Sequence, residues 1–140
     1  MNVLERQARF MLWVIIITAL LYLGVVPWVG FQKAFAMFGF FGFAGFTPLI
    51  GRKERKSGKI IMDERDREIE RIATLAGYSV FWVFFVAAAM TPFFMYGPNA
   101  KMTIDTGLPC DILFIAMALI FFVRSLVIVM LYRKGRVANV

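Results

Sequence analysis

The sequence predicts an all-α integral membrane protein, a bundle of four transmembrane helices with both termini in the cytoplasm. Three observations support this fold class. The 140-residue chain is 61% hydrophobic, with a mean hydropathy of +0.74, whereas soluble domains average about 45–50% apolar residues. Four apolar runs each approach the roughly 20 residues that an α-helix needs to cross the hydrocarbon core. The positive charges gather on the segments that would share one side of the membrane.

The four helices are expected at residues 10–29, 31–50, 63–96 and 109–132, in a single domain with a cytoplasmic loop at 51–62. Without water in the hydrocarbon core, each run must be helical to satisfy its own backbone groups. Glycine and proline residues mark the boundaries, among them Gly30, Gly51, Gly97 and Pro109. Because the first connection is very short, the first two helices should form an antiparallel hairpin.

The distribution of charge predicts the orientation. Of the sixteen Lys and Arg residues, thirteen lie at the N-terminus, between residues 51 and 71, or at the C-terminus, and two lie on the opposite connections. Membrane proteins carry an excess of Lys and Arg on the cytoplasmic flanks of their helices. We therefore expect a multi-pass protein of the cytoplasmic (cell) membrane with both termini inside. The same rule explains the net charge of +7, and nucleic acid is not expected as a partner.

The residue types present exclude several kinds of chemistry. Histidine is absent and cysteine occurs once, at Cys110, which excludes His-based metal sites, a Cys-X-X-Cys redox pair and a Cys-His dyad. No set of catalytic residues converges at one depth in the membrane. We therefore expect no catalytic residue, no metal ligand and no cofactor, and the chain is not expected to be an enzyme.

Arg124 interrupts the apolar run "LIFFVRSLVIV" of the fourth helix. It precedes Arg133 by nine residues, which places it about 13–14 Å from the cytoplasmic end and near the middle of the membrane. A charge at that depth is a functional hypothesis. The third helix is expected to enter the membrane near Ile72, and no Asp or Glu lies in the membrane-crossing part of any helix, so an acidic residue on a partner helix would be a natural mate. The structural alternative is that Arg124 snorkels to the headgroups or donates to backbone carbonyls.

The second run contains "FGFFGFAGF", in which small residues recur at every third position. In an α-helix such positions drift by about 60° per step, which gives a sloping ridge that another helix can approach closely. Ordinary packing in the bundle is favoured over a ligand groove, and the ridge could face inward or outward. The predicted helix-packing residues are Ala36, Gly39, Gly42 and Gly45, together with Ala73 and Gly77 on the third helix.

The middle loop begins with "RKERKSGK", residues 52–59. Basic residues near a bilayer surface attract anionic headgroups at about 1 kcal/mol each, although setting the topology is the simpler explanation. The residues expected to contact lipid headgroups are Arg52, Lys53, Arg55, Lys56 and Lys59.

The segment "MDERDREIE", residues 62–70, follows this loop. Asp63 has the properties of an N-cap, and acids in the first turn favour a helix start. Glu68 and Arg71 are among several opposite charges spaced by three or four residues, which stabilises a helix. The third helix should therefore begin in the cytoplasm and continue unbroken into the membrane. A solvated helix extension with internal ion pairs would explain these charges, but orientation requires only positive charge. The acids therefore suit either closure onto the termini of the bundle or docking of a protein on Asp63, Glu64, Arg65, Asp66, Arg67 and Glu68.

The stretch from "GFTPLI" through the basic loop to "MDERDREIERIA" resembles a class of small, uncharacterised prokaryotic membrane proteins. These have four predicted helices and a DERxxxI-type motif before the third helix. The similar block covers about residues 45–77. The class has no known function, so the resemblance implies an architecture and no chemistry.

These patterns favour a non-enzymatic membrane protein that acts by association, as an accessory subunit, an assembly factor or a membrane-anchored regulator of a larger complex. The expected partners are the bilayer with its anionic headgroups, another membrane protein or a second copy, and a cytoplasmic protein. The alternative function is a small oligomeric transporter or channel that uses Arg124.

Overall fold

The computed structural model describes residues 2–57, 62–97 and 108–137, and all regular structure in these ranges is helical. The long α-helices are α1 (Val3–Val29), α4 (Glu64–Tyr96) and α5 (Leu108–Val137). The shorter elements are α2 (Phe31–Ala34), the 3₁₀-helix η1 (Phe35–Leu49) and α3 (Arg52–Lys56). The predicted all-α class is confirmed.

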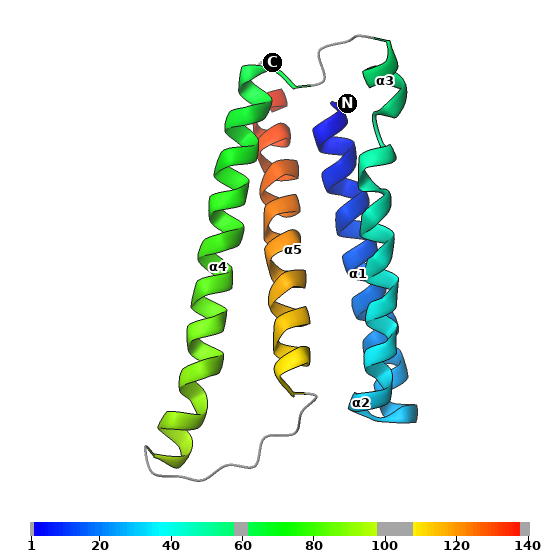
Figure 1. Ribbon diagram of the computed structural model, residues 1–140. Helices are drawn as coiled ribbons and strands as arrows, with labels where there is room; N and C mark the ends of the chain where they lie inside the picture. Colours follow the sequence, from blue (N-terminus) through cyan, green and yellow to red (C-terminus); the bar gives the residue numbers. More distant parts are fainter. Residues whose placement is uncertain (1, 58–61, 98–107, 138–140) are drawn as a thin grey trace.

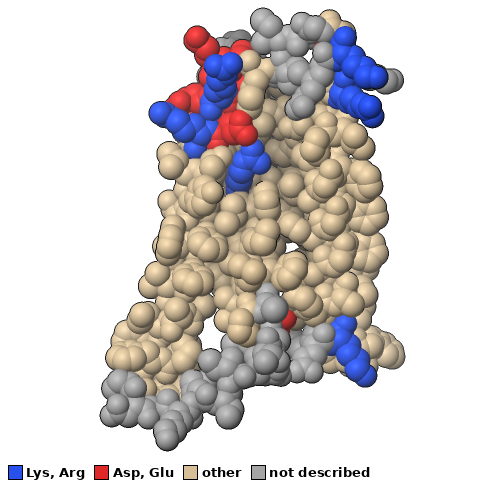
Figure 2. Space-filling view, in the orientation of Figure 1, with Lys and Arg blue, Asp and Glu red and all other residues tan. Residues whose placement is uncertain are grey.

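The long elements run side by side, with α5 in the centre (Figure 1). α4 packs on one side of α5 and α1 on the other, and η1 packs against α1. The start of α1, the start of α4 and the end of α5 lie together at one end of the molecule, next to α3 (Figure 1). We call this end the charged end, because the mixed cluster of acidic and basic side chains lies there (Figure 2).

Three of the helices, α1, α4 and α5, are long and apolar enough to cross a membrane. With 33 residues, α4 extends about 50 Å at the rise of an α-helix, well beyond a hydrocarbon core of about 30 Å. The predicted start of α4 is confirmed, because Asp63 is its N-cap. Two other helices were predicted too short. α1 begins at Val3 rather than near residue 10, and α5 continues to Val137 rather than ending near residue 132.

The second predicted α-helix, residues 31–50, is wrong in type, because residues 35–49 form a 3₁₀-helix. The sequence of η1 reads in triplets, FAM-FGF-FGF-AGF-TPL. A 3₁₀-helix has 3.0 residues per turn, so side chains three apart are aligned along its axis. The rings of Phe40, Phe43 and Phe46 follow one another in this way, with centroids 5.9 Å apart at each step. The period of the sequence therefore matches the period of the helix.

Each position of the triplet forms one straight face of η1. The first position is half-buried and packs towards α1 and α5, whereas the second is exposed. A Cβ atom added to Gly39, Gly42 or Gly45 would meet nothing within 4 Å. The predicted small-residue ridge is therefore straight instead of sloping and is exposed, and its glycines have no neighbour within this distance among the described residues. Its members are Ala36, Gly39, Gly42 and Gly45.

The 3₁₀ conformation also determines how far η1 reaches. Its 15 residues extend about 30 Å at a rise of about 2.0 Å per residue, but would extend only about 22 Å as an α-helix. The longer value is close to the thickness of the hydrocarbon core, about 30 Å.

The end of η1 is fixed by α1. The side-chain amide of Gln7 donates to the carbonyl oxygens of Thr47, at 3.3 Å, and Ile50, at 3.1 Å. The next residue, Gly51, has a φ of +94°, and a Cβ atom there would lie 2.5 Å from Cγ1 of Val3. Both the backbone conformation and the close approach of α1 therefore require glycine at this turn.

The 3₁₀ conformation of η1 can be tested by pulsed dipolar EPR in a Cys110→Ser background. Spin labels at Met37 and Leu49 are separated by the same number of residues as control labels at Tyr78 and Met90 in α4. We expect the mean distance in η1 to be about 6 Å longer than in α4, because of the larger rise per residue. Equal distances for the two pairs would show that η1 is an α-helix.

Candidate functional site

Two carboxylates cap the first turn of α4, and each accepts a hydrogen bond from the backbone of the other residue. Asp63 Oδ1 accepts a hydrogen bond from the backbone N–H of Asp66, at 2.7 Å, and Asp66 Oδ2 accepts one from the backbone N–H of Asp63, at 3.4 Å. This is a capping box in which both members are Asp. The N-cap predicted from the sequence is confirmed, and the box positions the Asp66 side chain.

Asp66 connects three helices at the charged end. Its carboxylate accepts hydrogen bonds from Asn2 Nδ2, at 2.9 and 3.0 Å, and from the hydroxyl of Tyr132 on α5. Only 2% of Asp66 is exposed. A hydrogen bond to a charged group contributes about 1.5–3 kcal/mol, and these bonds tie the start of α1 and the end of α5 to the start of α4. We call Asn2, Asp63, Asp66 and Tyr132 the Asp66 junction.

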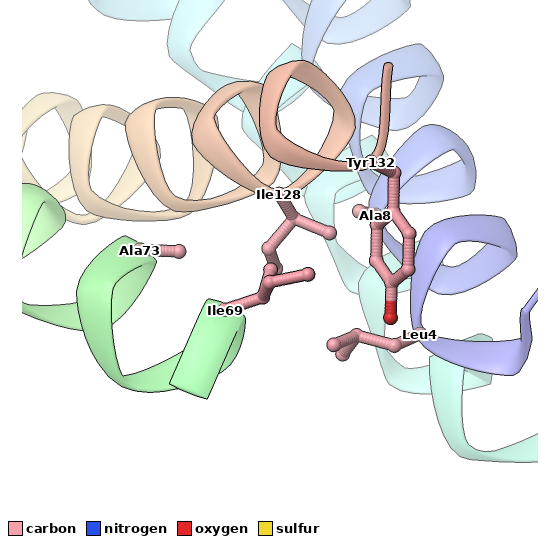
Figure 3. Close-up of a cluster of buried hydrophobic side chains, with 6 residues drawn as sticks. All are labelled: Leu4, Ala8, Ile69, Ala73, Ile128 and Tyr132. Atoms are coloured by element: carbon pink, nitrogen blue, oxygen red, sulfur yellow. The ribbon is translucent and has the colours of Figure 1, made fainter. Parts of the chain in front are cut away.

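A cluster of apolar side chains lies beside this junction. Side chains from α1, α4 and α5 converge on one another (Figure 3), and all members are buried. Tyr132 belongs to both groups, because its ring packs in the cluster while its hydroxyl reaches Asp66. The cluster consists of Leu4, Ala8, Ile69, Ala73, Ile128 and Tyr132.

α4 and α5 approach each other closely at Gly77. A Cβ atom there would lie 3.0 Å from the carbonyl oxygen of Ile120 and 3.6 Å from Cβ of Arg124. Ala73, one turn before Gly77, is fully buried. Ala73 and Gly77 therefore lie on the buried face of α4, where small residues allow another helix to approach closely.

Arg124 has an acidic partner within the chain, contrary to the expectation from the sequence. Its guanidinium donates to Glu70 Oε1 at 2.5 Å, and both side chains are about one-third exposed. Glu70 lies in the part of the predicted third helix that was expected in the cytoplasm, so a search for acids within the membrane missed it. Arg124 lies two turns before Tyr132 and Glu70 one turn after Asp66, so the long Arg124 side chain reaches about one turn towards the charged end to meet Glu70.

The charged residues of the predicted docking segment divide between opposite faces of α4. Asp66, Ile69, Ala73 and Gly77 are buried and spaced for one face. Asp66 therefore cannot dock a partner at the surface, which corrects its place in the predicted docking set. Asp63 and Arg65 are exposed but also serve the fold: Asp63 caps the helix, and the Arg65 guanidinium lies against Gly135 of α5.

The remaining charges form one exposed face on the opposite side of α4. Their spacing aligns them on the helix, and Glu68 and Arg71 form an ion pair at 2.8 Å. Acidic and basic side chains gather at the upper left of the molecule, where α4 begins (Figures 1 and 2). We call this surface the charged face; its members are Glu64, Arg67, Glu68 and Arg71.

The basic segment lies at the same end of the molecule. Arg52 and Lys56 of α3 are exposed, and Glu54 forms an ion pair with Arg6 of α1. The side chains of Lys53 and Arg55, and all of Lys59, lie outside the described residues. The predicted contacts with lipid headgroups stay a prediction.

Within residues 2–57, 62–97 and 108–137, no group of three or more acidic or cysteine side chains is placed to hold a metal ion. The side chain of Cys110 is outside the described part of the chain.

The model of a protein family described as "Predicted membrane protein (DUF2178)" matches residues 6–135. The chain belongs to this family. The match covers η1, α4 and nearly all of α1 and α5. This DUF2178 protein is thus a predicted multi-pass membrane protein of a family without known function, which agrees with the class implied by the resemblance. No curated protein and no solved structure matches the chain.

Replacing Tyr132 with Phe tests the Asp66 junction. The variant keeps the ring in the apolar cluster and removes only the hydroxyl, so we expect a loss of about 1.5–3 kcal/mol in the free energy of unfolding. The measurement is denaturant unfolding of the purified DUF2178 protein in mild detergent.

Tyr96→Phe is the matched control, because Tyr96 is exposed at the other end of α4. Its effect should remain within about 0.5 kcal/mol. A loss for Tyr132→Phe as small as that of the control would contradict the proposed stabilisation by the junction.

Proposed function

We propose that this DUF2178 protein is a non-enzymatic accessory subunit, assembly factor or regulator that binds another protein through the charged face. The observation that carries this proposal is the division of α4 into two sides. Asp66, Ile69 and Ala73 hold α4 against its neighbours, whereas the charged face is exposed on the opposite side.

The charged face contributes little to the stability of the fold. An exposed ion pair such as Glu68–Arg71 contributes roughly 0–1 kcal/mol, and Arg67 and Glu64 lie on the same exposed side. Acidic residues are not needed to orient a membrane protein. Closely spaced charges of both signs provide specificity in a protein–protein interface, because a partner of mismatched charge pattern is repelled. The partner we propose therefore presents a complementary surface of mixed charge.

We also propose that the charged end faces the cytoplasm and that η1 is a fourth membrane-crossing element. The excess of Lys and Arg at the charged end supports the orientation. The length of η1, about 30 Å in its 3₁₀ conformation, supports a crossing. The alternative function, a transporter that uses Arg124, has less support because Glu70 neutralises that charge within the chain.

Orientation can be checked at Cys110, the single cysteine of the chain. A thiol reagent that cannot cross membranes should label Cys110 in intact cells and fail to label it in sealed inside-out vesicles. Labelling restricted to the inside-out vesicles would reverse the proposed orientation.

Binding through the charged face can be tested by exchanging two charges. The double variant Glu68→Arg/Arg71→Glu still allows the ion pair within α4, but it reverses the charge pattern that a partner meets. We expect the native protein to retain a stoichiometric partner after extraction in mild detergent, and the variant to lose it at least about tenfold, since one mismatched contact exceeding 1.4 kcal/mol is sufficient.

Lys33→Glu is the control, because Lys33 is exposed in α2 at the opposite end of the molecule. It should leave recovery of the partner unchanged. A native protein that is purified alone, or a partner that tolerates the charge exchange, would overturn the proposal.

A further inference from the structure

A cavity of about 280 Å³ lies between α1, η1 and α5. Its walls include Ile15 to Leu23 of α1 and Ile115 to Phe122 of α5, so it follows α1 for about 12 Å. Both stretches lie within helices that are long and apolar enough to cross a membrane. A small opening among residues other than Lys, Arg, Asp and Glu is visible midway along the molecule (Figure 2).

Aromatic side chains of η1 create this space. Phe35 and Phe38 contact Phe114 of α5 edge-on and tilted, with centroids 5.1 and 6.0 Å apart, and Phe41 contacts Phe121 at 5.8 Å. These rings hold the backbone of η1 away from α5. Because side chains three residues apart align in a 3₁₀-helix, the rings of these three Phe residues lie along one line. Their contacts with α5 bound the cavity in both directions along the helix axes.

The lining is almost entirely apolar. The hydroxyl of Thr18 donates to the carbonyl of Val14 within α1, at 2.8 Å, so it is not directed to an occupant. The phenol of Tyr22 is the other polar group, and its ring packs on Phe38 with centroids 5.2 Å apart. Water needs two to four polar partners to occupy a cavity, and an apolar cavity of about 150 Å³ in a soluble protein stays dry and binds apolar ligands.

We propose that this cavity binds part of an acyl chain of a membrane phospholipid. Hydrocarbon is the solvent around α1 and α5 once they cross a bilayer, and it is the chemistry that the lining matches. The lining extends about 12 Å along α1, which fits a segment of a flexible alkyl chain. Such an occupant replaces the missing packing between η1 and α5 and does not depend on the protein partner proposed above.

The test uses the full-length protein in phosphatidylglycerol nanodiscs that contain a trace of the same lipid with a diazirine on its acyl chain. After irradiation, labelled residues are located by mass spectrometry. We expect labels to concentrate on Leu119 and Phe122 and on residues 15–23. Filling the space with Ala118→Phe should lower this labelling about tenfold, because the occupant and the new ring compete for one volume.

Ala89→Phe, on an exposed part of α4, is the matched control and should leave labelling of the cavity unchanged. If Ala118→Phe does not fold, as judged by its elution volume and helical circular dichroism, Ala118→Leu with Ala19→Leu takes its place. Labelling spread evenly over the exposed helices, labelling unaffected by filling, or an isoprenoid retained in the cavity after purification would each overturn the proposal.

Discussion

The arrangement of the helices depends on the carboxylate of Asp66. In a bilayer, helices gain little from burying apolar surface against one another, because lipid tails are equally apolar. Polar contacts and close packing must then select one register. Asp66 does so where three helices meet, because Asn2 and Tyr132 can reach it only when α1, α4 and α5 have one particular alignment. The Arg124–Glu70 pair and the close approach at Gly77 follow from that alignment.

The two sides of α5 are packed by different means. Against α4, small residues allow the backbones to approach closely, as at Gly77. Towards η1, large rings separate the elements and leave a cavity. The first kind of contact brings the backbones together, whereas the second leaves a space lined by apolar side chains. The charged face belongs to α4, which packs against α5 in the first way.

Much of the fold could be predicted from the sequence, because length and apolarity identify a membrane helix without knowledge of its neighbours. The start of α4 was also predictable, since Asp63 acts on backbone groups within its own turn. The 3₁₀ conformation of η1 was missed because an apolar run has the same composition in either helix type. The spacing of three residues was recognised only for the small residues. The phenylalanines repeat with the same spacing, and they would have indicated a 3₁₀-helix equally well.

The site was less predictable, because its decisive contacts join residues more than fifty positions apart. Asp66 lies among exposed charges, and only the position of α5 determines that it is buried. Glu70 was overlooked as a partner of Arg124 because the pairing depends on the register of two antiparallel helices.

The triplet faces of η1 have a consequence for how this segment can change in evolution. Gain or loss of one residue within residues 35–49 would rotate everything beyond it by about 120°, which moves aromatic rings onto the small-residue side. Gain of a whole triplet would keep every face in place and lengthen the element by about 6 Å. Among relatives, this segment is therefore expected to differ in length by multiples of three residues.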